Sequence, residues 1–427
     1  MRAEESTAVG DRVHKWLGVL RSGWAGARLL EVADAWTSNV DKHTVEGQPA
    51  VRLCNYVDVY KNDAITDSID FMSASATREQ IRKFRIRRDD TVITKDSETA
   101  DDIGVPAFVE YEADDLICGY HLAIVRPDAR RVVPKFLYWA LDSEPTARQW
   151  GVTAAGVTRV GIRSTDLNKV TIALPPLDEQ RAIADYLDRE TAQIDALVAK
   201  QEEFIGLLRE RRSAEISHAV QAAPSRVKLK YVAGAGQYGL NFPASEYVNT
   251  GTRLLRTSDL VGGRMTPSSD GIFVPEQAVS ERDRLASGDL LLSRSGTVGR
   301  GFVVPPEAEG MTFAGFLVRF RPKPDMDGRY LGYCTQTAEF QRVVQSEAVS
   351  STIQNFNADR YGNVDIPMLP IDAQLRVVNR LDEQTAQIDA LISKAGEHIA
   401  LAKERRAALI TAAVTGQFNV RTARKAA

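Results

Sequence analysis

The chain has 427 residues, of which 44% are apolar and 26% charged, and its formal net charge is -3. This composition is typical of a soluble globular protein with two to four domains, and the charge balance gives no overall preference for nucleic acid. No apolar run is long enough to span a bilayer, and the first residues lack the apolar core of a signal peptide. Three widely spaced cysteines fit neither a disulfide framework nor a zinc site, so we expect a cytoplasmic protein.

Residues 1–20 are predicted to form a short amphipathic helix, because apolar residues recur at three- and four-residue steps. Residues 21–175 lose this period and form the first predicted domain. Short apolar runs between turns predict strands at 51–53, 92–94 and 122–125. A helix is expected at 136–150.

The second half of the chain repeats this order. A long helix is predicted at 176–223, after two prolines, and a second domain at 224–368, with a strand at 290–292 and a helix at 328–345. A second long helix follows at 369–416, and residues 417–427 form a tail.

The two long helices are copies of each other. The heptapeptide Thr-Ala-Gln-Ile-Asp-Ala-Leu occurs at 191–197 and again at 385–391, and about half of the positions in 174–220 are identical in 368–414. The two domains are much less alike. Such a repeat indicates that the helices share one task, whereas the domains perform two related but distinct ones.

Each long helix has roughly 40 residues, or about 60 Å at 1.5 Å per residue. A helix of this length with one apolar stripe needs a partner, and the simplest partner is its own copy, in an antiparallel or a parallel pair. The residues predicted to form the packing stripe are Leu187, Ile194, Leu197, Leu381, Ile388 and Leu391. Asp195 and Asp389 lie beside this stripe at matched places, where they are either solvated or paired.

No catalytic arrangement is recognisable. The residues 234–239 spell a dinucleotide-binding fingerprint, but Pro243 stands where the required helix should begin, so we expect a glycine-rich loop. A phosphate loop and an Asn-Pro-Pro-Tyr motif are absent, and the five histidines are scattered. His121, among apolar residues, is expected to be a packed core histidine. We therefore predict no catalytic, cofactor-binding or metal-ligating residue.

Three sequence features together carry a family resemblance. Leu-Pro-Pro-Leu-Asp-Glu-Gln at 174–180 precedes Gln-Ile-Asp-Ala-Leu, Glu-Arg-Arg recurs near the end of each helix, and Gly-Asp-Leu-Leu-Leu-Ser-Arg-Ser-Gly occupies 288–296. With the alternation of variable domain and repeated helix, the chain resembles the specificity subunit of type I restriction-modification systems over nearly its whole length. The fold expected is α+β, with two target recognition domains separated and followed by two long helices that form an antiparallel coiled-coil pair, in an internal two-fold repeat.

The resemblance implies a non-catalytic DNA-recognition subunit. Each domain would read one half of a bipartite, asymmetric site in double-stranded DNA, and the helices would set the spacing and bind two methyltransferase subunits. Translocase-nuclease subunits would join the restriction complex. S-adenosylmethionine, ATP and Mg²⁺ would belong to those partner subunits, so this chain itself needs no cofactor and no membrane.

The expected DNA contacts are basic or polar residues in a basic segment, after a strand, or just before a repeated helix. They are Arg82, Lys83, Arg85, Lys95, Thr158, Arg159, Arg294, Ser295, Arg300, Thr352, Gln354 and Asn355. Each of them could also be an ordinary surface or turn residue. The rival hypothesis from another class is a protein-only scaffold, with two binding modules on a coiled-coil stalk. A self-contained methyltransferase is disfavoured by the missing motifs.

Overall fold

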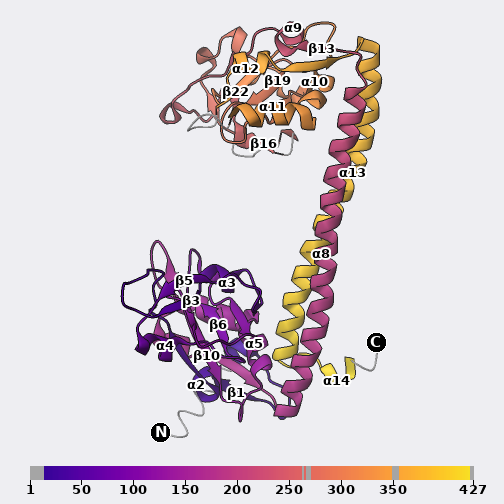
Figure 1. The fold of residues 1–427 in the computed structure, drawn as a ribbon. Coiled ribbons are helices and arrows are strands. Elements are labelled where there is room, and N and C mark those ends of the chain that lie inside the picture. Colours follow the sequence, from indigo (N-terminus) through magenta and orange to yellow (C-terminus); the bar gives the residue numbers. More distant parts are fainter. Residues whose placement is uncertain (1–13, 262–263, 266–270, 349–354, 424–427) are drawn as a thin grey trace. The chain divides into compact units, whose positions relative to one another are not determined.

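The structure is a computed structural model that describes residues 14–261, 264–265, 271–348 and 355–423. By their contacts the residues form two compact units: Met1–Lys200 with His398–Ala427, and Gln201–Glu397. Each unit therefore contains one of the two predicted domains together with one end of each long helix (Figure 1). The predicted N-terminal helix falls largely on residues outside the described ranges.

The first unit is a mixed α/β structure. Its strands are β1 (Ala25–Arg28), β2 (Ala33–Thr37), β3 (Ala50–Cys54), β4 (Ala64–Ile65), β5 (Met72–Ser75), β6 (Thr91–Thr94), β7 (Asp96–Ser97), β8 (Pro106–Val109), β9 (Leu116–Cys118), β10 (Leu122–Pro127), β11 (Val160–Gly161) and β12 (Thr171–Leu174). Its helices are α2 (Leu29–Val32), α3 (Tyr56–Tyr60), α4 (Arg78–Phe84), α5 (Pro134–Leu141), α6 (Glu144–Thr153), α7 (Ser164–Leu167) and α14 (Val420–Ala423), with the ends of α8 (Leu177–Gln221) and α13 (Ile371–Val414).

The second unit contains the remaining elements. Its strands are β13 (Ser225–Lys228), β14 (Gln237–Tyr238), β15 (Thr252–Leu255), β16 (Leu260–Val261), β17 (Arg264–Met265), β18 (Phe273–Val274), β19 (Leu290–Ser293), β20 (Gly301–Val303), β21 (Thr312–Phe313), β22 (Leu317–Phe320) and β23 (Asp365–Met368). Its helices are α9 (Leu229–Ala233), α10 (Gly328–Thr335), α11 (Ala338–Ala348) and α12 (Ala358–Gly362), with the other ends of α8 and α13.

Each unit is built on a sheet that is buried on both faces. Among the described residues the strand order is β2-β10-β6-β8-β4 in the first unit and β14-β22-β19-β20 in the second. Ala123 and Val125 of β10 face a core that includes α5 and the long helices, while Leu122 and Ile124 face the core under β3 and β9. Alternate residues of one apolar run thus serve two cores, which explains why the run shows no hydrophobic–polar alternation.

The helices predicted at 136–150 and 328–345 are each broken once. The first is α5 followed by α6, and the second is α10 followed by α11. At the breaks the hydroxyls of Ser143 and Thr337 donate to the carbonyls of Ala140 and Cys334, at 2.7 and 2.9 Å. These hydrogen bonds satisfy carbonyls that the helix end leaves open. At the first break Pro145 lies in the first turn of α6, a position that a proline tolerates although it would interrupt a continuous helix.

A buried glutamine attaches each domain to its long helix. Gln180 accepts from the Val133 amide at 2.7 Å and donates to the Pro175 carbonyl at 2.8 Å. Gln374, the same position in the repeat, accepts from the Asp327 amide and donates to the Leu369 carbonyl, both at 2.8 Å. The glutamine of the repeated motif at the start of each long helix therefore binds the helix to the domain that precedes it.

Within each unit the two long helices run in opposite directions in contact. In the first unit Leu187 near the start of α8 shares a core with Ile410 near the end of α13, and in the second Ile216 shares one with Leu381. Across the helices, the Arg406 Nε lies 3.1 Å from Asp195 Oδ1, and the Arg212 Nε donates to Asp389 Oδ1 at 3.0 Å.

The predicted packing stripe is partly wrong. Leu187 and Leu381 are fully buried and Ile194 and Ile388 nearly so, but Leu197 is 50% exposed and Leu391 47%. The buried face continues instead through Thr191 and Thr385, whose hydroxyls donate to the carbonyls of Leu187 and Leu381 at 2.7 Å. A threonine satisfied within its own helix can be buried at little cost, so counting apolar residues alone gave the wrong face.

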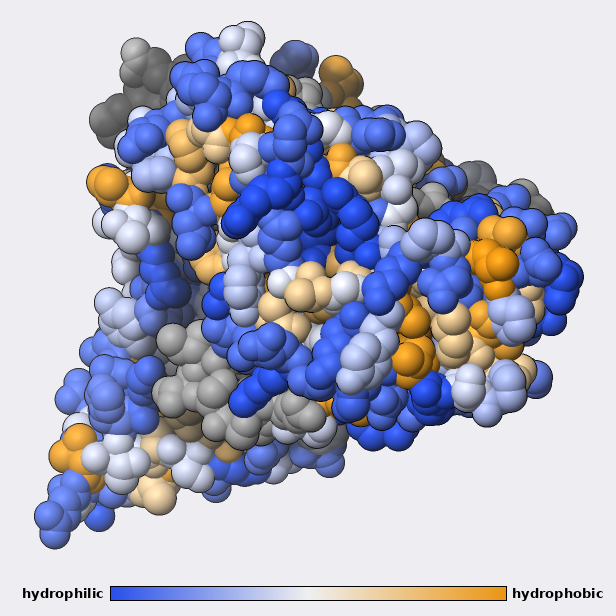
Figure 2. Space-filling view, turned by 90° about the horizontal axis from the view of Figure 1, so that it is seen from above, coloured by the Kyte–Doolittle hydropathy of each residue, from blue (hydrophilic) through white to orange (hydrophobic). Residues whose placement is uncertain are grey.

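The three cysteines are buried, and burial raises the pKa of each thiol. The glycine-rich segment at 234–239 leads from α9 into β14 and not into a helix, as predicted. In the described part of the chain no helix is long and apolar enough to cross a membrane. The face drawn in Figure 2 is largely hydrophilic, with hydrophobic residues in small separate patches, which is normal for a globular surface.

Candidate nucleic-acid interface

In each domain a guanidinium pairs with a buried carboxylate that directly precedes a central strand of the sheet, β6 in the first domain and β19 in the second. Arg126 donates from Nε and Nη2 to both oxygens of Asp90, at 2.8 and 2.7 Å, and Arg321 does the same to Asp289, at 2.8 and 2.7 Å. Burial raises the pKa of the Asp90 carboxyl, and the hydrogen bonds from Arg126 oppose that shift. Such two-pronged pairs fix geometry as well as charge.

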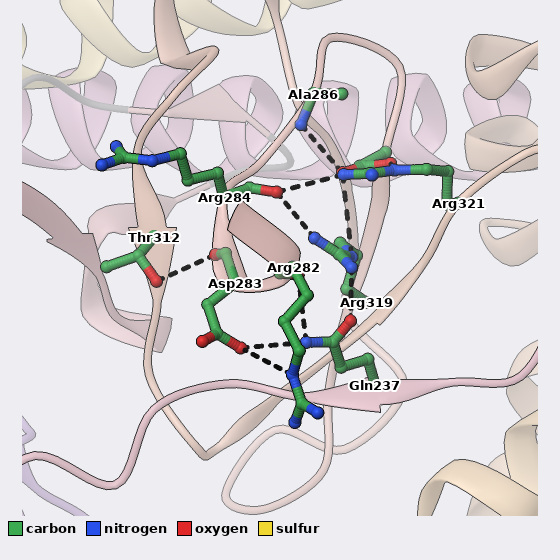
Figure 3. A network of polar contacts seen from close by, with 9 residues as sticks. Gln237, Arg282, Asp283, Arg284, Ala286, Thr312, Arg319 and Arg321 are labelled. Carbon is green, nitrogen blue, oxygen red and sulfur yellow. Dashed lines mark hydrogen bonds and ion pairs between the residues drawn. The ribbon is translucent and has the colours of Figure 1, made fainter. Parts of the chain in front are cut away.

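These pairs hold the basic segment that precedes each central strand. In the first domain Arg126 also donates to the Arg85 carbonyl at 3.2 Å. In the second domain Arg321 donates to the Arg284 carbonyl at 3.0 Å (Figure 3). The second domain adds Arg319, which donates to the same Arg284 carbonyl at 2.7 Å. The backbone carbonyl of each basic segment is therefore bound by an arginine whose carboxylate partner is buried, and in the second domain the buried Arg319 adds a second hydrogen bond.

The predicted contacts of the first basic segment differ in their surroundings. Arg82 and Lys83 are exposed in the last turn of α4. Arg85 is half-buried, and its guanidinium lies 2.5 Å from Asp114 and 3.7 Å from Glu112. Arg82 and Lys83 thus remain suited to phosphate contacts, whereas Arg85 is already neutralised by carboxylates.

The loop after the central strand carries a cation over a tyrosine in both domains. The Lys95 Nζ lies 4.6 Å from the Tyr120 ring centre, and the Arg294 guanidinium lies 4.8 Å from the Tyr238 ring centre. Lys95 also donates to Asp96 Oδ2 at 2.7 Å. Aromatic contacts of this kind hold a charged side chain in one orientation.

The same loop touches the segment that precedes the long helix, a contact that the sequence analysis did not predict. In the first domain β7 pairs with β11, which follows the exposed bend of Thr158 and Arg159. In the second domain Ser295 forms a bridge with Asn355, and Asn355 accepts from Arg294 Nε at 3.4 Å. Thr352 and Gln354 lie outside the described residues.

A polar hollow adjoins each loop. In the first domain it measures about 480 Å³ and is lined by Tyr56, Asp96, His121 and Arg159, among others. In the second it measures about 260 Å³ and is lined mainly by hydroxyl groups and the exposed Arg300. The first hollow contains three carboxylates, those of Asp96, Glu98 and Asp102, whereas the second contains none.

His121 is not the core residue that the sequence predicted. Its side chain is 42% exposed, and Nδ1 lies 2.7 Å from Asp96 Oδ2, the oxygen that Lys95 also contacts. Its ring meets Tyr120 edge-on, with the centres 4.9 Å apart. Gly119, at the turn before β10, brings the histidine to the sheet edge; the apolar neighbours belong to the two flanking strands.

The described residues hold no group of three or more His, Cys, Asp or Glu side chains suited to a metal ion. The cations and amides gathered at the two loops are instead the residue types that contact phosphates and base edges in DNA.

Comparison with known proteins finds matches for part of the chain. Residues 54–204 match the model of the type I restriction modification DNA specificity domain. The chain is 22% identical over 185 residues to the type I restriction enzyme StySPI specificity subunit of Salmonella potsdam, which covers 42% of this chain and 38% of that protein. It is 22% identical over 187 residues to the type I restriction enzyme EcoKI specificity subunit of Escherichia coli K12, a match that covers 43% of this chain and 39% of that protein.

Solved structures share the fold over a longer range. A chain from a study of complex assembly and conformational transition in the type I R-M system has a TM-score of 0.66 and 21% identity, covering 94% of this chain and all of that one. The HsdS subunit from Thermoanaerobacter tengcongensis has a TM-score of 0.51 and 20% identity, and the match covers 93% of this chain and 98% of that one. The predicted resemblance to type I specificity subunits is confirmed, although the alignments span about two fifths of the first two curated relatives.

Proposed function

We propose that this chain, which carries a type I DNA specificity domain at residues 54–204, recognises DNA as the specificity subunit of a type I restriction-modification complex. In this proposal each domain reads one half of a bipartite, asymmetric site. The chain itself is non-catalytic, and methyl transfer, ATP use and cleavage belong to methyltransferase and translocase-nuclease partners.

The matched loops carry this proposal. Each domain places one cation, Lys95 or Arg294, after its central strand, supports it with a tyrosine and sets it against the segment before the long helix. Their surroundings differ, because carboxylates line the first hollow and hydroxyls the second. A shared frame with different side chains is what two readers of two different half-sites require.

The long helices support the proposed assembly. The Asp195–Arg406 and Asp389–Arg212 pairs and the shared cores favour an antiparallel coiled-coil pair in a two-fold repeat, which would fix the spacing of the half-sites. Leu197 and Leu391 are left exposed at matched positions of this repeat. Exposed leucines on an ordered helix are suitable contacts for methyltransferase subunits.

The direct test is selection from a DNA library randomised in both half-sites, using the chain assembled with its methyltransferase. Arg294→Ala should relax the preference at one position of the second half-site by about 5- to 150-fold if the guanidinium reads a base. Lys323→Ala removes one cation beyond the other end of β22 and should leave the preference unchanged.

Two results would count against the proposal. A complex that selects no sequence would remove DNA recognition and favour the protein-only scaffold. A purified single chain that transfers methyl groups from S-adenosylmethionine, or hydrolyses ATP, would show that the chain is not a recognition subunit alone.

A further inference from the structure

One position lies directly beside the loop cation in each domain. In the register of the central strands, Thr94 pairs with Leu122 and Ser293 pairs with Leu317. One step outward, the Lys95 amide donates to the His121 carbonyl at 2.9 Å, and the Arg294 amide donates to the Phe316 carbonyl at 3.0 Å. His121 and Phe316 therefore occupy the same place in the two domains.

Both side chains are exposed there. His121 is 42% exposed, and Phe316 is 63% exposed, which is unusual for a phenylalanine next to a well-packed strand. Gly315, the residue before Phe316, lies close to the Asn241 side chain, because a Cβ at Gly315 would lie 2.1 Å from Asn241 Oδ1.

Asp96 determines what His121 offers to a ligand. An ionised carboxylate only accepts hydrogen bonds, and Asp96 Oδ2 already accepts from the Lys95 ammonium, so His121 must donate to it from Nδ1. In the neutral ring Nε2 then carries a lone pair and accepts. This makes His121 complementary to an amino group, in contrast to Arg294, which can only donate.

We propose that positions 121 and 316 are a matched pair of base-reading positions. His121, oriented by Asp96, accepts from the exocyclic amino group of an adenine or cytosine in the first half-site, and Phe316 contacts the methyl group of a thymine in the second. In the major groove those amino and methyl groups are the features that an acceptor and an apolar side chain distinguish. The inference rests on the proposed function.

The test is a reciprocal exchange in the assembled complex, read out with the same doubly randomised library. His121→Phe should reduce the preference for adenine or cytosine at one position of the first half-site about tenfold or more and leave the second half-site unchanged. Phe316→His should reduce a thymine preference in the second half-site only. His218→Phe makes the first exchange and Tyr231→His a similar aromatic-to-histidine exchange at exposed residues elsewhere, and both should change neither half-site.

Two further variants separate base reading from structure. His121→Gln should narrow the first-domain position to adenine, because a glutamine side chain pairs with both N6 and N7 of that base. Asp96→Ala should reproduce the His121→Phe result, and Asp96→Asn should restore the preference, because its amide oxygen can accept both hydrogen bonds. Asp96 acts here as a positioning residue.

The outcomes distinguish this inference from the proposed function. If the wild-type complex selects no sequence, the proposed function fails first. If the wild type selects a site and the exchanges change no preference, lower affinity equally for all sequences, or act on the opposite half-site, the inference is wrong and DNA recognition stands.

Discussion

Asp142 is expected to destabilise the first unit at neutral and alkaline pH. It follows α5, and its Oδ2 lies 3.6 Å from Nη1 of Arg406, which also contacts Asp63 and Asp195. One guanidinium thus faces three carboxylates. Burial raises the pKa of Asp142 to about 7, and the charges of Asp63 and Asp195 act in the same direction. At the matched position the second unit has Gln336, which accepts from Arg212 at 2.9 Å without a charge.

The sign of the effect follows from the two protonation states. Between the ordinary aspartate pKa and about 7, the folded chain keeps a proton that the unfolded chain has lost, so stability falls as the pH rises through this window. Three pKa units correspond to an upper limit of about 4 kcal/mol at about 1.4 kcal/mol per unit. Because the side chain is 23% exposed and still faces Arg406, we expect Asp142→Asn to stabilise the unit by about 1–3 kcal/mol at pH 8.

Tryptophan fluorescence can follow this unit alone, because all five tryptophans precede residue 200. Urea unfolding of the wild type and Asp142→Asn at pH 4, 6 and 8 should show a difference that is small at pH 4, grows to pH 7 and is constant above it. Asp67→Asn, at an exposed carboxylate of the same unit, should change little. A destabilised Asp142→Asn at pH 8, or a gain independent of pH, would refute this reasoning.

Two other predictions concern stability. Arg126→Ala leaves Asp90 buried without its partner and should lower the free energy of unfolding in urea by about 3–5 kcal/mol. Arg321→Ala should lower it less, because Arg319 lies 3.9 Å from the equivalent aspartate, Asp289. Equal losses of stability in the two variants would contradict this role of Arg319. Leu187→Ala should lower the free energy of unfolding by about 2–5 kcal/mol, because Leu187 is fully buried. Leu197→Ala should hardly change the stability of the isolated chain but should weaken methyltransferase binding in a pull-down titration. A loss of stability at Leu197 as large as at Leu187 would show that Leu197 is buried in solution.

The sequence predicted the positions of the strands better than the cores against which their two faces pack. The apolar runs that became β6, β10 and β19 were placed within one or two residues, because buried strands have strong β-branched and leucine signatures. Their role as a divider between two cores did not follow from the pattern, since a run that is apolar at every position gives no information on which residue faces which side.

The ion pairs between the helices were only half predictable. The repeat predicted that Asp195 and Asp389 lie beside the packing stripe, and it contains a recurring Glu-Arg-Arg. It did not predict that these aspartates and arginines contact each other. Their pairing requires that one helix runs against the other, which places the aspartate of each copy beside the arginine of its partner copy. Residue spacing within one helix contains no information on the direction of its neighbour.

The positions of Lys95 and Arg294 in the candidate interface followed from sequence motifs, whereas the position of His121 was predicted wrongly. Lys95 and Arg294 were expected after a strand and lie there. His121 was assigned to the core because its neighbours along the chain are apolar, whereas its neighbours in space are Lys95, Asp96 and Tyr120. The Gly-Tyr-His sequence between two apolar runs was the available sign of a turn that exposes its last residue.

The deep burial of Cys54, Cys118 and Cys334 has a practical consequence. Thiols with raised pKa values and no solvent access react slowly with maleimides. A cysteine introduced at an exposed position of each unit, such as Val152 and Tyr231, should therefore accept a fluorophore in the otherwise natural chain. A donor and an acceptor at these two positions would report directly on the distance between the two units, with and without added DNA.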